Sequence, residues 1–278
     1  MSKLDSFYSN LKRSFKDNSA IDWDSSLAKL KDLVGTDIEK SKLSHQYKNI
    51  IQAVGHNKNI RILDYGCGGG QLATYLLLAG YKDVYGVDVN NQEMNNDFIA
   101  KLGFKKRIFS SYDKKQLPFE NDSFDLLISQ QVLEHVHNLD DYYSEASRVL
   151  KKGGIALLDF PHKFIPYDSH AQKYFIHFFP RFLRKPLYNY FTEKGFEHYD
   201  SILNFQTLGH HKRIALKYFT SHENKTADRI KKFEYSGTYE GNLRLRKLVD
   251  TLIQSKVFGQ AFLLIFTQLA IADIKLIK

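Results

Sequence analysis

Apolar and polar residues alternate along residues 59–160 in a way that predicts strands and helices in turn. Apolar runs of strand length are separated by amphipathic stretches of 10–13 residues, which is the pattern of βαβ units around a parallel sheet. The predicted strands cover residues 60–65, 83–89, 106–110, 124–129 and 154–160, and the predicted helices cover residues 70–79, 90–102 and 139–150. We therefore expect an α/β fold with a doubly wound, mostly parallel sheet.

Residues at the helix ends support these boundaries. Gly80 and Gly103 follow the first two helices, and glycine commonly ends a helix. Asn138 precedes the third helix as an N-cap, and Asp140 and Asp141 place negative charge in its first turn. The helices of this region are thus predicted from caps as well as from periodicity.

The rest of the chain divides into three further regions. Residues 1–58 are predicted to form a helical N-terminal extension, with helices at 24–34 and 44–54. Residues 161–200 are rich in aromatic residues and proline, and we interpret them as an insertion after the fifth strand. Residues 201–278 are expected to complete the sheet.

The last apolar segment, residues 257–274, is interrupted by polar side chains that include Gln260, Gln268 and Asp273. A membrane-spanning helix needs about 20 predominantly apolar residues. We therefore interpret the segment as a buried helix that is followed by a final strand over residues 271–277.

Length and composition suit a folded chain without disulfides. The chain has 278 residues, of which 43% are apolar, enough for a full core. Its single cysteine, Cys67, excludes an intramolecular disulfide and suits a reducing compartment. Residues 1–18 are polar and charged and lack the apolar segment of a signal peptide. We therefore expect a cytoplasmic protein.

Positive charge is concentrated in the second half of the chain. Residues 1–150 carry 19 Lys or Arg and 20 Asp or Glu, whereas residues 151–278 carry 21 and 11. Such an excess either serves solubility or faces an anionic partner: a nucleotide-linked or lipid-linked phosphate, a membrane surface or nucleic acid. Charge alone does not choose between them.

The first predicted strand leads into a glycine-rich turn with the sequence Asp64-Tyr65-Gly66-Cys67-Gly68-Gly69-Gly70. In open parallel sheets, ligands bind in the crevice at the carboxyl ends of the strands, next to helix N-termini that offer free N–H groups. Asp88 ends the second strand, and a carboxylate there can accept both ribose hydroxyls of an adenosine. An adenosine-containing ligand is therefore expected.

Two observations bear on which nucleoside binds. The dinucleotide pattern G-x-G-x-x-G fails from Gly66, because residue 71 is glutamine, and passes only in its weaker form from Gly68. Asp64, just before the glycines, would repel a diphosphate and suit an ammonium group. S-adenosylmethionine (SAM) carries an ammonium and a sulfonium and no phosphate.

A third motif runs from Leu117-Pro118-Phe119 through Phe124-Asp125 to Val132-Leu133-Glu134-His135-Val136. With the glycine turn and the acidic residue after strand two, residues 60–160 resemble class I SAM-dependent methyltransferases. The resemblance is to the broad type 11 subgroup, which includes ubiquinone-biosynthesis enzymes. It implies a Rossmann-like methyltransferase fold with a mostly parallel seven-stranded sheet, methyl-transfer activity, and SAM as the cofactor.

The same resemblance implies that nine residues hold the cofactor. The implied contacts are from Asp64, Gly66, Gly68 and Gly70 to the methionine end, from Asp88 to the ribose, from Val89, Tyr112 and Asp113 to the adenine, and from Gln130 to the methyl group and acceptor. Cys67 is interpreted as a small turn residue beside the cofactor.

Transfer to a hydroxyl benefits from a general base. His135 and His162 follow the fourth and fifth strands, so both could point into one crevice and are the candidate catalytic residues; His170 is a further candidate base. Each could instead be structural. Some relatives hold a divalent ion through E-x-x-E-H and a later histidine. Here Gln131 replaces the first glutamate of that motif, leaving Glu134 as its only carboxylate, and glutamine is a poor ligand, so no metal is expected.

Aromatic residues recur at helical spacing over residues 174–185, with Arg181, Arg184 and Lys185 beside them. We predict one helical stripe, which either packs on the main domain or makes a peripheral contact with the inner face of a membrane. Base stacking is a third option, but no recognised RNA module surrounds the stripe, so a nucleic acid partner is not expected.

The function expected from the sequence is O-methylation of a sugar in bacterial surface-polysaccharide biosynthesis, because residues 161–200 loosely resemble methyltransferases of that setting. The acceptor would be a small or lipid-linked saccharide. A quinone or lipid methyltransferase and a non-catalytic SAM-binding protein are the alternatives. The N-terminal helices, with Tyr47 among them, are a candidate lid over the crevice.

Overall fold

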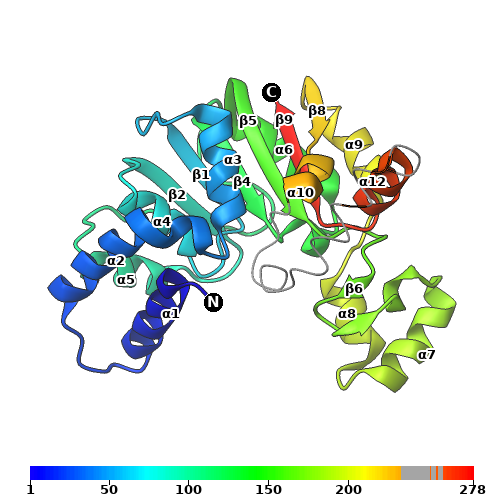
Figure 1. The fold of residues 1–278 in the computed structure, drawn as a ribbon, viewed down its shortest axis with the longest axis horizontal. Helices are drawn as coiled ribbons and strands as arrows, with labels where there is room; N and C mark the ends of the chain where they lie inside the picture. Colours follow the sequence, from blue (N-terminus) through cyan, green and yellow to red (C-terminus); the bar gives the residue numbers. More distant parts are fainter. Residues whose placement is uncertain (233–250, 252–254, 256–258) are drawn as a thin grey trace.

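A seven-stranded sheet runs through the middle of the molecule (Figure 1). The computed structural model describes residues 1–232, 251, 255 and 259–278. The strands of the sheet are β1 (Arg61–Tyr65), β2 (Asp83–Asp88), β3 (Phe109–Ser111), β4 (Phe124–Gln130), β5 (Leu150–Phe160), β8 (Ser221–Asn224) and β9 (Ala272–Ile277). Their order is β3-β2-β1-β4-β5-β9-β8, in which β9 runs antiparallel to the other six strands. The expected doubly wound, mostly parallel seven-stranded sheet is thus confirmed.

Helices cover both faces of this sheet. One face packs on α1 (Lys3–Lys16), α2 (Trp23–Asp37), α3 (Ser44–Val54), α4 (Gln71–Leu78) and α5 (Glu93–Lys101), and the other on α6 (Leu139–Val149) and α9 (Leu208–Ala215). Ile62 and Leu63, consecutive in β1, are fully buried in different cores. Side chains alternate between the faces of a strand, so an apolar run with no polar face belongs at the centre of such a sheet.

Most helix and strand boundaries lie close to those predicted. The helix predicted at 44–54 is α3, and the Asn138 side chain accepts hydrogen bonds from the backbone of Asp140 and Asp141 at the start of α6, as a cap should. Two strands differ in length. β3 begins only at Phe109, and β5 begins at Leu150, directly after α6.

The predicted N-terminal region contains a helix that the apolar pattern had not singled out. In α1, Leu4, Tyr8 and Leu11 are buried at spacings of four and three residues. Asp37 accepts a hydrogen bond of 2.9 Å from the backbone of Leu4, which fixes the start of α1 against the end of α2. The extension is therefore packed into the main core.

The segment from β6 to α8, residues 167–202, forms a small lobe away from the sheet (Figure 1). Its elements are β6 (Tyr167–Asp168), β7 (Lys173–Tyr174), the 3-10 turn η3 (Ile176–Phe178), α7 (Arg181–Phe191) and α8 (Gly195–Ile202). It has a core of its own, made by Ala171, Ile176, Tyr188, Phe196 and Tyr199.

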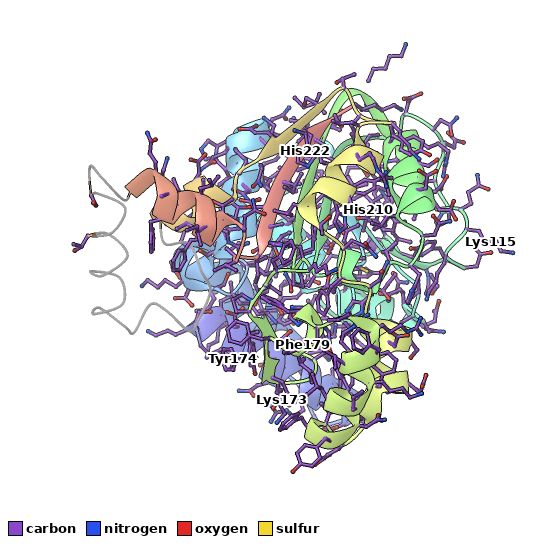
Figure 2. All side chains as sticks on the ribbon, turned by 90° about the vertical axis from the view of Figure 1, so that its right-hand side faces the viewer. Lys115, Lys173, Tyr174, Phe179, His210 and His222 are labelled. Carbon is purple, nitrogen blue, oxygen red and sulfur yellow. The ribbon has the colours of Figure 1, made fainter. Side chains whose placement is uncertain are left out.

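The prediction of one helical stripe over residues 174–185 is wrong. Phe175 has a φ of 61°, which no helix accommodates, and Pro180 begins a new helix, α7. The aromatic side chains are nevertheless exposed: Tyr174 by 69% and Phe182 by 74%. Figure 2 shows Tyr174 and Phe179 in this lobe.

The helix predicted to be buried near the end of the chain is also different. It appears as α12 (Gly259–Thr267), in which Leu264 and Ile265 are 69% and 57% exposed. The final strand, β9, is buried as predicted. Within the described ranges, no helix has the length and apolar content needed to cross a membrane. The remaining elements are η1 (Ile38–Lys40), η2 (Leu133–His135) and α10 (Thr226–Lys232).

Candidate active site

A cavity of about 1160 Å³ opens at the carboxyl ends of β1, β2 and β4. This is the edge at which parallel sheets bind their ligands. The predicted site residues that line it are Asp64, Gly66, Gly68, Asp88, Val89, Tyr112, Gln130 and His135. Residues from three neighbouring strands and the loops after them are thus brought to one place.

The glycine turn after β1 depends on positive φ angles, which residues other than glycine rarely adopt. Gly68 has a φ of 48°, and no atom lies within 4 Å of where its Cβ would be, so the turn leaves open space beside its backbone. Gly70 has a φ of 71°, but a Cβ there would lie 2.6 Å from Cζ of Phe109. Gly70 therefore packs behind the turn and does not line the cavity.

Asp64 is the buried acid of the turn, 3% exposed at the cavity wall. Burial raises the pKa of its carboxyl to about 7, helped by the negative charge of Asp88 and opposed by a backbone hydrogen bond from Ala73. A carboxyl so placed is only partly ionised near neutral pH. It would be stabilised as a carboxylate by a cationic ligand.

Asp88 joins the second strand to the same turn. Its Oδ2 accepts a hydrogen bond of 2.9 Å from the backbone of Gly68, and its Oδ1 accepts bonds from the backbone and side-chain amides of Asn90. The carboxylate therefore positions the loop as well as facing the cavity. Val89, 43% exposed, follows it on the cavity wall.

Aromatic rings form another part of the wall. Tyr65 stacks on Tyr142 with ring centroids 4.5 Å apart, and the hydroxyl of Tyr112 lies 3.3 Å from that of Tyr65. Cys67 is buried in the glycine turn next to Gln92, and burial raises the pKa of its thiol, which keeps it protonated and unreactive. The cavity thus combines two acids with a flat, apolar surface.

Helix α1 closes the cavity on another side and was missed by sequence reasoning. Tyr8, Ser9, Lys12, Arg13 and Lys16 of this helix line the cavity. The ammonium of Lys12 donates hydrogen bonds to the carbonyl of Gly69 and, over 2.6 Å, to Oδ1 of Asn95, and burial lowers its pKa to about 8. The amphipathic spacing of α1 was a usable signal for a packed helix, although not for its place.

Tyr47, named as part of a candidate lid, does not line the cavity. The cations of α1 do, together with Lys42, Lys114 and Lys115. Figure 2 shows Lys115 extending outward at the surface. This part of the cavity wall is therefore basic, whereas Asp141, Glu145 and the acids of the turn line other parts of it.

His135 lies on the cavity in a defined tautomer. Its Nδ1 is 2.7 Å from the carbonyl oxygen of Ile202, and because a carbonyl only accepts hydrogen bonds, Nδ1 carries the proton. The lone pair of the neutral ring is then on Nε2. This is the arrangement a general base requires.

His162 does not share this position, and the prediction that it points into the crevice is wrong. It is fully buried, its Nε2 lies 3.0 Å from the carbonyl oxygen of Ala270, and it is absent from the cavity wall. Burial lowers the pKa of the ring to about 4, so it stays neutral at physiological pH. Its role here is to join β5 to the segment before β9.

Asp113 also lies outside the cavity wall. Its side chain is exposed and accepts a hydrogen bond of 3.0 Å from the backbone of Lys115, so it shapes the loop after β3. Gln131 is on the wall instead. Its side-chain amide donates a 2.6 Å hydrogen bond to Asp159, which pairs in turn with Arg229 of α10.

The residues that could hold a divalent ion in the structure differ from those that the sequence motif indicated. Glu134, His135 and His170 offer ligand atoms that lie within 4.8 Å of one another, whereas His162, considered in this role, is remote from the cavity. Burial raises the pKa of Glu134 to about 8, so this carboxyl is largely protonated at neutral pH without a nearby cation. These three side chains lie close together, but only one of them is a carboxyl ligand.

The sheet order, the glycine turn and the acids at the ends of β1 and β2 define the class: this is the class I SAM-dependent methyltransferase fold. Residues 63–158 match the family model described as a methyltransferase domain. In structure, the chain is similar to a SAM-dependent methyltransferase from Mesorhizobium loti, with a TM-score of 0.54 and 15% identity over 87% of this chain and 100% of the other.

Two curated relatives are similar in sequence. A ubiquinone biosynthesis O-methyltransferase of Pelagibacter ubique is 32% identical over 104 residues, 36% of this chain and 42% of the relative. A sterol 4-C-methyltransferase of Caenorhabditis elegans is 32% identical over 137 residues, 47% of this chain and 38% of the relative. The match thus spans less than half of each relative.

Proposed function

We propose that this protein transfers a methyl group from SAM to an oxygen atom of an acceptor. The observation that carries the proposal is one cavity that holds the buried acids Asp64 and Asp88 around a glycine turn and also presents His135 with a free Nε2 lone pair. The two acids suit the binding of SAM, and the histidine suits removal of the acceptor proton.

The residues present fit SAM better than a dinucleotide. Asp64 is desolvated and makes no ion pair with a described residue, so an amino-acid ammonium would offset the cost of its burial, whereas a diphosphate at the same turn would raise that cost. Asp88 accepts hydrogen bonds from the loop and has lone pairs left for ribose hydroxyls. The open space at Gly68 leaves room for the ligand to approach the backbone.

The chain's own contribution to the reaction is positioning and proton removal. When bound, SAM would supply an electrophilic methyl group for in-line transfer to the acceptor oxygen, with S-adenosylhomocysteine as the leaving group. Nε2 of His135 takes the proton of the acceptor hydroxyl, while the carbonyl of Ile202 holds the ring in the tautomer that leaves this nitrogen free. The tyrosine pair Tyr65 and Tyr142 and helix α1 limit the access of water.

For the acceptor, we propose a sugar in surface-polysaccharide biosynthesis, either small or lipid-linked. The support is the excess of positive charge in residues 151–278, which suits a phosphate-linked sugar, and the loose resemblance of the insertion. The exposed aromatic side chains of the lobe, Tyr174, Phe175 and Phe182 among them, would bring the cavity to the inner face of a membrane that carries such a lipid.

A second candidate acceptor is a quinone or another lipid. The observation that favours it is the similarity to relatives named as ubiquinone and sterol methyltransferases, together with the apolar rings on the cavity wall. A non-catalytic SAM-binding protein is the remaining alternative.

Two measurements test the proposal. Isothermal titration with SAM and with NAD should give binding of SAM alone; tighter binding of NAD would refute the cofactor assignment. The protein is then incubated with SAM and a panel of nucleotide sugars, lipid-linked glycans and quinones. We expect S-adenosylhomocysteine release and a mass gain of one methyl group on one class. SAM binding without turnover across the panel would favour the non-catalytic alternative.

A further inference from the structure

A second cavity, of about 320 Å³, lies where the small lobe meets the main domain. Its wall is built from the loop after β5, η3, the start of α7, Asp200 near the end of α8, and residues 203–206. His137 lines both this cavity and the active-site cavity, so the two adjoin at that residue. A molecule held in the smaller cavity would therefore lie next to the proposed reaction site.

The wall of the second cavity carries surplus positive charge. Three permanent cations line it, Lys163, Arg181 and Arg184, against a single acid, Asp200. Arg181 is paired with Asp200 over 2.7 Å, and the side chain of Arg184 makes no hydrogen bond or ion pair with any described residue. The described side chains that line this cavity thus carry a net charge of about +2.

Two of the lining side chains carry buried nitrogen atoms that make no hydrogen bond of normal geometry with a described residue. His177 is 2% exposed, and neither of its ring nitrogens makes a hydrogen bond of normal geometry; Nε of Arg184 is likewise buried and unbonded. Burial lowers the pKa of His177, so the ring is neutral at pH 7 and still carries one N–H to donate. Buried donors of this kind are costly unless something accepts from them.

Helix α7 adds a further donor surface. Pro180 and Arg181, at its first turn, line the cavity, and no side chain caps that end. The N-terminus of a helix favours anions through its free N–H groups and its dipole. Phe179 contributes an apolar part of the wall (Figure 2).

We propose that this second cavity binds a phosphoryl group of the methyl acceptor. The donors come from several separate elements, which suits a tetrahedral anion; a planar carboxylate is commonly held by one arginine fork. A surplus of two positive charges matches a phosphate dianion, and water could satisfy the donors but not the charge. The assignment to the acceptor rests on the proposed methyltransferase function, whereas anion binding itself does not.

The size of the cavity agrees with this assignment. At about 320 Å³ it is at the lower end of the range for small-molecule sites, roughly 300–1,000 Å³. It holds a phosphate or a diphosphate but not a whole nucleotide sugar or lipid. The remainder of the acceptor would extend past His137 toward His135.

The test measures anion binding to the full chain in the absence of SAM. Inorganic phosphate and pyrophosphate are titrated by isothermal calorimetry, and the R184Q and H177F variants are compared with the unchanged protein. We expect binding at one site, weakened at least about tenfold in each variant, because each loses a donor to a charged ligand. If H177F does not fold, the comparison of R184Q with the unchanged protein is the test.

K185Q is the matched control, because Lys185 is adjacent on α7, pairs with Glu197 and does not line the cavity. Its affinity should stay within about twofold of the unchanged protein. Equal weakening in K185Q and R184Q would overturn the proposal, and so would a lack of binding to phosphate, pyrophosphate and phosphatidic acid vesicles alike. SAM affinity is measured on the same samples, so failure of the cofactor assignment is seen separately.

A further arm separates the two sources of the phosphoryl group. Phosphatidylcholine vesicles with and without phosphatidic acid are tested for co-sedimentation with the protein. Binding of soluble pyrophosphate that depends on Arg184 supports a soluble acceptor, and Arg184-dependent binding to phosphatidic acid vesicles alone supports a lipid-linked one. Vesicle binding unaffected by R184Q, together with no pyrophosphate binding, contradicts the site.

Discussion

At the scale of single residues, Asp64 shows how a binding group can weaken the protein that carries it. Its carboxyl is buried, and its pKa is about 7 where an exposed aspartate has 3.8. Between these two values, folding requires proton uptake, so stability falls as pH rises and stays low above pH 7. A bound ammonium would reverse this by stabilising the carboxylate.

The D64N variant should therefore be more stable and bind SAM less well. Without ligand at pH 8, its free energy of unfolding should exceed that of the unchanged protein by roughly 2–4 kcal/mol, because no buried charge remains. At pH 5 the gain should be much smaller. Thermal unfolding at both pH values checks this, and an equal gain at both would contradict the assignment of the raised pKa to Asp64.

The affinity for SAM should depend on pH for the same reason. As pH falls below about 7, Asp64 must lose a proton before it can pair with the ammonium, so Kd should rise by up to about tenfold for each pH unit. Calorimetry from pH 6 to pH 8 measures the slope. A slope that persists in D64N would have to come from another group.

His135 gives a prediction about turnover. The H135A variant should lose about 10²–10⁴-fold in kcat, because the acceptor proton has no base, while the Kd for SAM stays within about twofold. H56A, which removes an exposed histidine far from the cavity wall, is the control. Normal turnover in H135A would make this histidine structural.

At the scale of elements, α1 is tied to the glycine turn by buried polar contacts. Asp5 accepts hydrogen bonds from Gln71 and Tyr75 of α4 and from the backbone of Lys42, at 2.8–3.2 Å. Lys12 reaches the turn itself. Order in α1 and order in the cofactor-binding turn should therefore be linked.

Removing one carboxylate should loosen this link. D5A should lower the free energy of unfolding by roughly 2–4 kcal/mol, because several buried donors lose their acceptor, and it should weaken SAM binding as well. D24A, which removes an exposed acid from the first turn of α2, should cost less than about 1 kcal/mol. Chemical denaturation of both variants checks the difference; equal losses would count against the link.

Residues 59–160 were predictable because each element combines a periodic apolar pattern with a local stop signal. Gly80, Asn138 and the turn at Gly66 act within a few residues of the chain, so sequence alone locates them. The place of α1 on the cavity depends on contacts across more than 50 residues, such as Lys12 to Gly69. No local pattern records such a contact.

The residues of the candidate site were likewise predictable only where the local sequence sets their position. Asp64 and Asp88 occupy strand ends, whose position follows from the sheet, and both line the cavity. His162 also follows a strand, but its ring turns away to the carbonyl of Ala270, a partner 108 residues later. The prediction of a helical stripe in the lobe failed because Phe175 has a positive φ, which interrupts a helix despite the helical spacing of the aromatic residues.

At the scale of the whole molecule, the lobe and the sheet domain present different surfaces. Within the described residues of the lobe, Tyr174, Phe175, Phe179, Phe182 and Leu183 are exposed apolar side chains. An exposed group of this kind commonly marks an interaction site. We propose an anionic membrane as its partner, consistent with the cations on the same lobe.

Vesicle binding tests that surface. F182S should lower the affinity for phosphatidylglycerol vesicles, measured by co-sedimentation, by about 10–100-fold, because one inserted aromatic ring contributes roughly 1.5–3 kcal/mol. L264S removes an equally exposed side chain from α12 and serves as the control. Similar losses in the two variants would show that exposure in general, and not the lobe, drives the association.

The place of β9 has a consequence for how the molecule is made. This strand pairs with β5 on one side and β8 on the other, yet residues 272–277 leave the ribosome long after both neighbours. Until then the nascent chain carries an unprotected strand edge at β5 while the cofactor-binding half is already able to fold. We therefore expect the growing polypeptide to depend on chaperones during that interval.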